Sequence, residues 1–230
     1  MKNPRRIALT SSLIDELNLS TKKPPKDSLF WQMWEDCTEI AKQALATKYV
    51  QAIGAGDLKP VTYGAFNVVD AYYCFNGAQD YLLAESRTED HLLRQFLLLK
   101  YQGYQRYNSE FTKIWHIRNA EGVIPDDVCK EYSQYESRIA SHEEPIYSLI
   151  VMLPCEYLWY WLSDQLFPPA KSNLYSSWIT GNHDPNGAYA MGNFIHEYQK
   201  KHPSSIDVAK AKQIYKQATT YEYKNFAQAV

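Results

Sequence analysis

The middle of the chain reads Met152-Leu-Pro-Cys-Glu-Tyr-Leu-Trp-Tyr-Trp161, which places one thiol directly after a proline in an aromatic-rich, helix-like run. Pro154 has no N–H to bond the carbonyl of Ile150 and clashes with that turn, so we expect a kinked helix beside Cys155. The apolar run from Ile146 to Phe167 contains several polar residues, which is typical of a buried helix and not of a membrane span. A thiol at such a kink is a candidate nucleophile, although a buried structural cysteine fits the same pattern.

Length and composition favour one folded domain of modest charge. The chain has 230 residues, of which 45% are hydrophobic, enough to bury one large core. Its formal net charge of −2 gives no electrostatic reason to expect nucleic acid or an anionic membrane surface as a partner. The N-terminal basic residues are not followed by an apolar run of signal-peptide length. Small-molecule chemistry or contacts with other proteins are therefore the expected activities.

The cysteines favour a reducing compartment. Cys37, Cys74, Cys129 and Cys155 lie far apart in the sequence and show no paired spacing typical of zinc sites or redox dithiols. We expect four free thiols and a cytoplasmic location.

Helical periodicity covers nearly the whole chain. After about residue 26, apolar residues recur at the three-and-four spacing of a helix face until the segment Gly54–Pro60 stops the pattern. Further helices are expected at about 62–84, 89–117, 126–141, 142–167 with Pro145 in its first turn, 174–180, 188–201 and 204–229, the last with a serine cap. No stretch alternates convincingly as a strand. The sequence therefore predicts an all-α bundle of about seven to nine helices, with residues 27–230 as a single domain and residues 1–26 as a loosely attached tail.

Polar residues in apolar surroundings give further candidates for chemistry. Asp70 and Tyr73 are three residues apart, so they share one helix face. A carboxylate in such a wall needs donors from the protein or from a ligand that carries N–H groups. Glu222 stands between two tyrosines, and if it faces the core, burial would suit it to proton transfer near neutral pH. Tyr132 is the third candidate. Each also has an ordinary structural interpretation: an internally satisfied aspartate, a solvated glutamate and an amphipathic helix face.

The order of the motifs is more specific than any of them alone. The segment Gly56–Tyr73 ends in Asp70-x-x-Tyr73, and it is followed by Leu153-Pro-Cys155, then by Tyr175-x-x-Trp178-Ile179, and near the end by Tyr221-Glu222-Tyr223. In this order, over residues 28–228, the chain resembles the TenA family, that is, thiaminase II or aminopyrimidine aminohydrolase. Tyr132 also falls at the distance before the cysteine at which that family has a site tyrosine.

The resemblance implies a heme-oxygenase-like helical bundle without heme, metal or other cofactor, assembled as a homotetramer or dimer. It also implies hydrolysis at the methylene carbon of a 4-amino-2-methylpyrimidine, releasing an amine or, from thiamin, the thiazole. Cys155 would add to the ring as the nucleophile, and Glu222 would move protons to the leaving group and from water. Asp70 would hold the aminopyrimidine edge, and Tyr73 and Tyr132 would orient the ring or the cysteine.

Three positions depart from the family pattern. Val69 stands where the family has glutamine before the aspartate. Four residues after the cysteine the family has tyrosine, and this chain has Trp159 with Tyr160 beside it. Asn182 stands where another site tyrosine is expected. These changes alter the expected pocket wall, so they bear on which substrate is used more than on the reaction class, and Trp159, Tyr160 and Asn182 are expected to contact the substrate.

Other functions remain as alternatives. A heme oxygenase needs an axial histidine on the first helix, and the first histidine here is His91, on the third predicted helix. The six histidines show no paired spacing that would place di-iron ligands on one face. The remaining alternative is a TenA-like pocket that binds a different small molecule, with changed substrate or no turnover. Retention of Cys155 together with Glu222 favours the enzyme.

Overall fold

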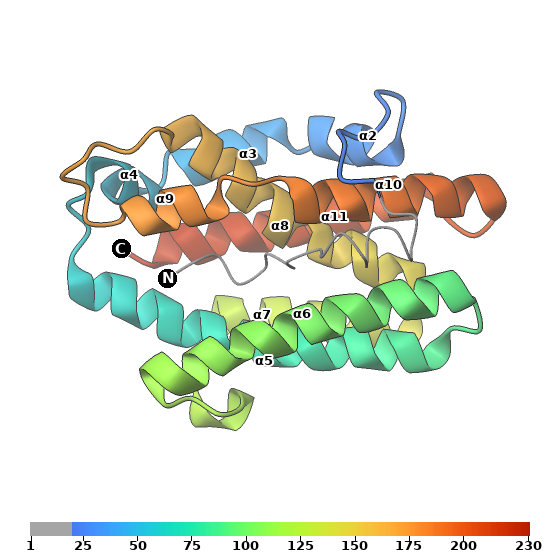
Figure 1. The fold of residues 1–230 in the computed structure, drawn as a ribbon, viewed down its shortest axis with the longest axis horizontal. Helices are drawn as coiled ribbons and strands as arrows, with labels where there is room; N and C mark the ends of the chain where they lie inside the picture. The colour runs from blue at the N-terminus through green and yellow to red at the C-terminus, as the bar shows by residue number, and fades with distance from the viewer. Residues whose placement is uncertain (1–19) are drawn as a thin grey trace.

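The computed structural model describes residues 20–230, and within that range it contains helices and no strand (Figure 1). The predicted all-α class is confirmed. In chain order the elements are α2 (Leu29–Glu35), α3 (Thr38–Leu45), α4 (Lys48–Ala55), α5 (Pro60–Arg87), α6 (His91–Trp115), the 3-10 turn η1 (Ala120–Gly122), α7 (Asp127–His142), α8 (Ile146–Leu166), α9 (Ser176–Asn182), α10 (Asn186–Lys201) and α11 (Val208–Gln228).

The first predicted helical run is divided into three short helices, so the described residues form ten α-helices instead of seven to nine. Asp36 ends α2, and Cys37 is the non-helical residue before α3. Thr47 caps α4, its hydroxyl accepting a hydrogen bond from the Val50 amide at 3.4 Å. Gly56 ends α4 in the left-handed conformation, with φ of 79°. Apolar spacing continues across both breaks, which is why periodicity alone did not separate these helices.

The cap of the last helix also differs from the prediction. The expected cap was Ser204, but α11 begins at Val208 and the Asp207 side chain accepts a hydrogen bond from the Lys210 amide at 3.0 Å. Ser205 instead belongs to a turn in which its hydroxyl donates to the carbonyl of His202. Aspartate is as effective a cap as serine, so the sequence offered two equivalent starting points.

The helices form two groups with a buried pair between them (Figure 1). Helices α5, α6 and α7 pack together on one side, and α2, α3, α4 and α10 lie on the other. Helices α8 and α11 pack against each other between these groups. Every residue from Ile146 to Trp159 in α8 is buried, and the helix continues through Pro154. The central apolar run of the sequence is therefore the central helix of the fold.

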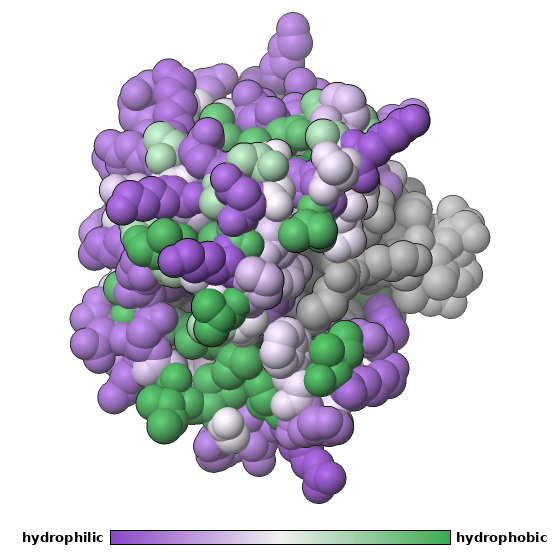
Figure 2. All heavy atoms as spheres, turned by 90° about the vertical axis from the view of Figure 1, so that its left-hand side faces the viewer, coloured by the Kyte–Doolittle hydropathy of each residue, from purple (hydrophilic) through white to green (hydrophobic). Residues whose placement is uncertain are grey.

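One end of the bundle carries exposed apolar side chains. Val61 at the start of α5, Ile114 at the end of α6 and Ile124 after η1 are exposed, and Figure 2 shows apolar groups gathered on this end of the molecule. Helices α5 and α7 begin at this end and α11 finishes there, so the first and last turns of these three helices come together.

The described part of the expected tail is attached to the bundle. The Asn193 side-chain amide donates to the carbonyls of Ser20 and Lys22 at 2.8 and 2.7 Å, and the Trp31 indole N–H donates to the carbonyl of Pro24 at 3.0 Å. Residues 1–19 lie outside the described range, so the proposed boundary of the domain stays a prediction. In the part of the chain that the structure describes, no helix is long and apolar enough to cross a membrane.

Candidate functional site

Cys155 lies in the centre of α8 and is fully buried. Its thiol donates to the carbonyl of Met152 at 2.9 Å, and the hydroxyl of Tyr104 from α6 lies 3.4 Å from Sγ. The thiol also lies close enough to Tyr73 and Tyr132 to contribute to the raised pKa of both phenols, whose main cause is burial. Residues of four helices, α5, α6, α7 and α8 itself, therefore lie near this sulfur.

Glu222 of α11 faces the same region and is buried. The Tyr132 hydroxyl of α7 donates to its Oε1 at 3.2 Å, and the Trp159 indole N–H of α8 donates to its Oε2 at 2.9 Å. Trp159 is one turn after Cys155 on α8, so a single helix supplies the thiol and a donor to the acid. The tryptophan that departs from the family pattern is thus a direct hydrogen-bond partner of the candidate acid.

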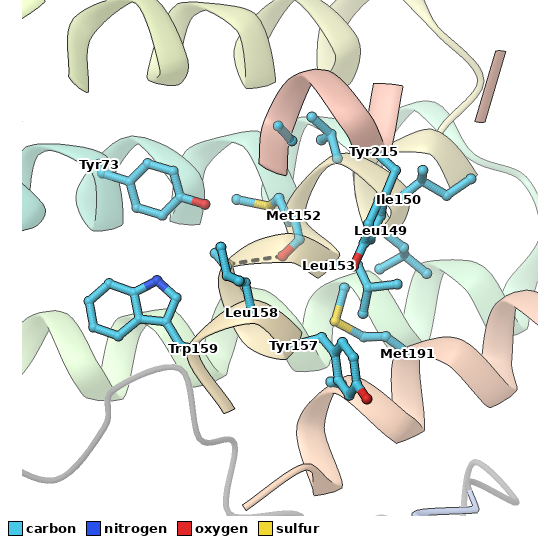
Figure 3. Packing of buried hydrophobic residues seen from close by; sticks show 14 of the residues in the cluster. Tyr73, Leu149, Ile150, Met152, Leu153, Tyr157, Leu158, Trp159, Met191 and Tyr215 are labelled. Atoms are coloured by element: carbon cyan, nitrogen blue, oxygen red, sulfur yellow. Dashed lines mark hydrogen bonds between the residues drawn. The ribbon is translucent and has the colours of Figure 1, made fainter. Parts of the chain in front are cut away.

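Tyr73 of α5 joins this group from the opposite side. Figure 3 shows its hydroxyl pointing from α5 toward α8, the helix that carries Met152 and Trp159. Its hydroxyl lies 3.5 Å from that of Tyr132, and the two ring centroids are 4.9 Å apart. The same hydroxyl donates to Oε1 of Glu136 on α7 at 2.7 Å. Burial keeps the pKa of both phenols well above the usual value for tyrosine, so both hydroxyls retain their protons at neutral pH and act as donors.

A pocket of about 240 Å³ lies between the first turns of α5 and α7 and the last turns of α11. Asp70 and Tyr73 line it, together with Asp126 and Cys129 of the α7 start and Asn225 of α11. Its charged lining side chains are two aspartates, with no lysine or arginine among the lining residues. A ligand that donates hydrogen bonds or carries positive charge would complement this wall.

A buried ion pair involves the residue that follows Cys155 in the sequence. Lys100 of α6 contacts Oε1 of Glu156, the residue after Cys155, and both side chains are almost fully buried. The Lys100 ammonium also lies 5.9 Å from the ring centroid of Tyr81 on α5. This pair links α6 to the centre of α8 at the position of the candidate nucleophile.

The chain matches known proteins by structure but not by sequence. No family model and no curated protein sequence matches the chain. Among solved structures, a TenA homologue from P. horikoshii OT3 matches with a TM-score of 0.74 at 15% identity, covering 88% of this chain and 98% of its own. A TenA homologue from Pyrococcus furiosus gives a TM-score of 0.74 at 15% identity over 88% of this chain and all of its own. The chain has the TenA fold.

A third similar structure carries a functional description of its own. It is a protein from Sulfolobus solfataricus P2 described as a TenA-like thiaminase, and it matches with a TM-score of 0.65 at 13% identity over 86% of this chain and 93% of its own. The agreement in fold confirms the architecture that the ordered motifs suggested. The roles of individual side chains within this TenA fold remain predictions.

The TenA fold brings six of the eight predicted site residues into one region. Cys155, Glu222, Tyr73, Tyr132 and Trp159 are joined as described above. Asp70 lies one turn before Tyr73 on α5 and lines the pocket; it also accepts a weak S–H bond from Cys74, with Sγ 3.8 Å from Oδ2.

Tyr160 and Asn182 are the two predicted site residues that do not belong to this region. Tyr160 is partly buried and stacks on His183, with ring centroids 6.0 Å apart. The Asn182 side-chain amide donates to the carbonyl of Trp178 at 2.7 Å, and Trp178 packs on Trp159. Neither residue lines the pocket, so their predicted contact with a substrate stays a prediction.

Sequence reasoning missed Glu136, Tyr104 and Lys100, three residues with buried polar groups. Glu136 is four residues after Tyr132 and therefore on the same face of α7, a spacing that was visible in the sequence. Tyr104 and Lys100 are likewise four residues apart on α6. Their partners come from other helices, and no local pattern indicates that pairing. Among residues 20–230, no group of three His, Cys, Asp or Glu side chains could hold a metal ion.

Proposed function

We propose that this protein hydrolyses aminomethyl-pyrimidines or thiamin, as part of thiamin salvage or degradation in the cytoplasm. The supporting observation is the hydrogen-bonded group in which Tyr132 and Trp159 donate to Glu222 while Cys155 lies one turn before Trp159 on α8. In this proposal α7, α8 and α11 together supply a nucleophile, an acid and the donors that orient the acid. A homotetramer or dimer is the proposed assembly.

The proposed reaction begins when the Cys155 sulfur forms a bond to a carbon of the pyrimidine ring and the thiol proton passes to a ring nitrogen, from which it returns to sulfur in the last step. The bond between the methylene carbon and the leaving group then breaks. Glu222 gives a departing amine its proton, whereas the thiazolium of thiamin takes the electron pair and leaves as a neutral thiazole. Water next bonds to the methylene carbon and loses a proton to Glu222, which restores the acid. The carbon–sulfur bond breaks last and regenerates the thiol. The products are the hydroxymethyl-pyrimidine and the released amine or thiazole.

The pocket next to this group supports the assignment of the substrate. An aminopyrimidine presents an exocyclic amine with two N–H donors, and thiamin adds a positively charged thiazolium. Asp70 and Tyr73 are hydrogen-bond acceptors on one face of α5 that line the pocket, and Asp126 adds a second carboxylate. The proposed position of the pyrimidine is therefore against α5, with the leaving group toward the start of α7.

The test is hydrolysis of thiamin and of 4-amino-5-aminomethyl-2-methylpyrimidine by the purified protein. Cys155→Ser should abolish turnover, and Glu222→Gln should lower kcat by about 10²–10⁴-fold. Cys37→Ser is a matched control, since Cys37 is an equally buried thiol between α2 and α3. Turnover by Cys155→Ser equal to that of the wild type would remove the cysteine from the mechanism.

One observation favours a pocket that binds without turnover. The Cys155 thiol is fully buried, donates to the carbonyl of Met152, and does not line the pocket. In that case 4-amino-2-methylpyrimidine would bind with an affinity that Asp70→Asn weakens, and no product would form. Calorimetric titration beside the turnover assay separates the two functions.

A further inference from the structure

A continuous series of hydrogen-bonding groups connects two buried glutamates. Tyr73 donates to Glu136 Oε1 at 2.7 Å, and its hydroxyl lies 3.5 Å from that of Tyr132. Tyr132 then donates to Glu222 Oε1 at 3.2 Å. The series passes from α5 to α7 and on to α11, and it begins with a carboxyl that the proposed mechanism does not use.

The directions of these hydrogen bonds follow from the number of protons available. A phenol has one proton to donate and two lone pairs that accept. The Tyr73 proton points at Glu136, so this oxygen has no second proton to donate and can only accept a hydrogen bond from a ligand. Asp70, three residues earlier, is also an acceptor, and both residues line the pocket. The α5 wall therefore presents two acceptors to a ligand that carries N–H groups.

Burying the Glu136 carboxyl at this position costs desolvation free energy. It is 1% exposed, and its Oε2 has no hydrogen-bond partner among the residues that the structure describes. Burial raises the pKa of this carboxyl well above the usual range, and the nearby Asp80 raises it further. An apolar side chain of similar size would avoid this desolvation cost, so stability of the fold does not account for a glutamate here.

We propose that Glu136 is a positioning residue: by accepting the Tyr73 proton, it fixes the Tyr73 oxygen as an acceptor toward the bound pyrimidine. The inference rests on the proposed function and adds a residue to the same site. Without Glu136, the remaining acceptor is the Tyr132 oxygen at 3.5 Å, which is too distant to hold the Tyr73 proton, so this proton can turn into the pocket. A donor would then face the N–H groups of the ligand, and one hydrogen bond would be lost.

Four variants test this: Glu136→Gln, Glu136→Leu, Tyr73→Phe and the double variant Tyr73→Phe with Glu136→Leu. Glutamine keeps the accepting oxygen at the same place, so Glu136→Gln should retain kcat/KM within about threefold, whereas Glu136→Leu should lose about tenfold, the size of one hydrogen bond. Glu136→Leu should have no further effect on kcat/KM once Tyr73 is phenylalanine, because its role passes through that hydroxyl. Thermal unfolding of each variant confirms that it is folded at the assay temperature.

The outcomes separate this inference from the proposed function. Wild-type turnover with an unchanged Glu136→Leu variant would overturn the role of Glu136 alone, as would a tenfold loss that persists in the Tyr73→Phe background. Equal losses in Glu136→Gln and Glu136→Leu would also overturn it, because the acceptor is retained in only one of them. A folded wild-type protein that neither hydrolyses nor binds 4-amino-2-methylpyrimidine would overturn the proposed function, and this inference with it.

Discussion

Two glutamates are buried in the core beside the candidate nucleophile, and they are held in different ways. Glu222 receives its hydrogen bonds from neutral donors, the Tyr132 hydroxyl and the Trp159 indole N–H. Glu156 is paired with the ammonium of Lys100, and both side chains of that pair are almost fully buried. Both residues are buried, with 6% of Glu156 and 2% of Glu222 exposed, so their partners and not their exposure distinguish them.

The difference indicates which glutamate is suited to chemistry. If Glu222 takes up or loses a proton, its partners remain neutral groups that can still donate hydrogen bonds. If Glu156 were to lose its charge, the Lys100 ammonium would remain buried without a counterion, which costs several kcal/mol. We therefore interpret the Lys100–Glu156 pair as a structural link between α6 and α8, and the Glu222 group as the part of the site in which a proton can move.

The largest effect on stability is expected from breaking the ion pair. Lys100→Met should lower the free energy of unfolding by about 3–5 kcal/mol, because it leaves the Glu156 charge buried and unpaired. Adding Glu156→Leu should recover most of that loss. Glu222→Gln, which replaces a carboxyl held by neutral donors, should change stability far less. Urea denaturation of the four proteins measures these differences, and an equal loss in Lys100→Met and Glu222→Gln would contradict the comparison.

Asp80, another buried carboxyl, extends the comparison to the pH dependence of stability. Asp80 accepts a hydrogen bond from the Ser137 hydroxyl at 3.1 Å, and burial raises its pKa to about 7. This folded value is above the unfolded value, about 3.9, so in this window the folded state holds a proton that the unfolded chain has released. Stability should therefore fall as pH rises from about 4 to about 7, by about 2–4 kcal/mol.

The matched variant for this pH effect is Asp80→Asn, since an amide does not titrate. Its melting temperature should decline less than that of the wild type between pH 4 and pH 7. Glu136 contributes a change in the same direction, because its pKa is also raised, so some slope should remain in the variant. Parallel curves for the two proteins over this range would show that Asp80 is ionised in the folded state.

The order of the helices followed from sequence, but some of their ends did not. The long helices α5, α6 and α8 have apolar residues over several turns. A pattern of that length identifies a helix even where a single residue would also fit another structure. The first run is different, because a residue such as Thr47 can serve equally well inside a helix or as a cap. Its role depends on where the neighbouring helices pack, which a single sequence does not show. The same reasoning explains the four-residue difference at the start of α11.

The candidate site was predictable only in part for a related reason. Cys155, Asp70 and Glu222 were singled out by residue type and by the order of their motifs. The partners of Glu222 come from α7 and α8, and no spacing in the sequence indicates that an indole N–H would reach this carboxylate. Glu136 was overlooked because its partner, Tyr73, is 63 residues away along the chain. Pairing between helices is a property of the packed core and not of any local pattern.

The smallest effect is expected from a substitution of Trp159. It tests whether this residue, which departs from the family pattern, orients the Glu222 carboxyl. Trp159→Phe retains an aromatic ring against Trp178 and Phe226 but removes the N–H that donates to Glu222. We expect kcat/KM to fall about tenfold with stability nearly unchanged, since one hydrogen bond to the Glu222 carboxyl is lost. Trp161→Phe is the control on the same helix, because that indole packs on Trp34, away from the acid. If both variants lose activity equally, Trp159 acts through packing, and Glu222 depends on Tyr132 for its orientation.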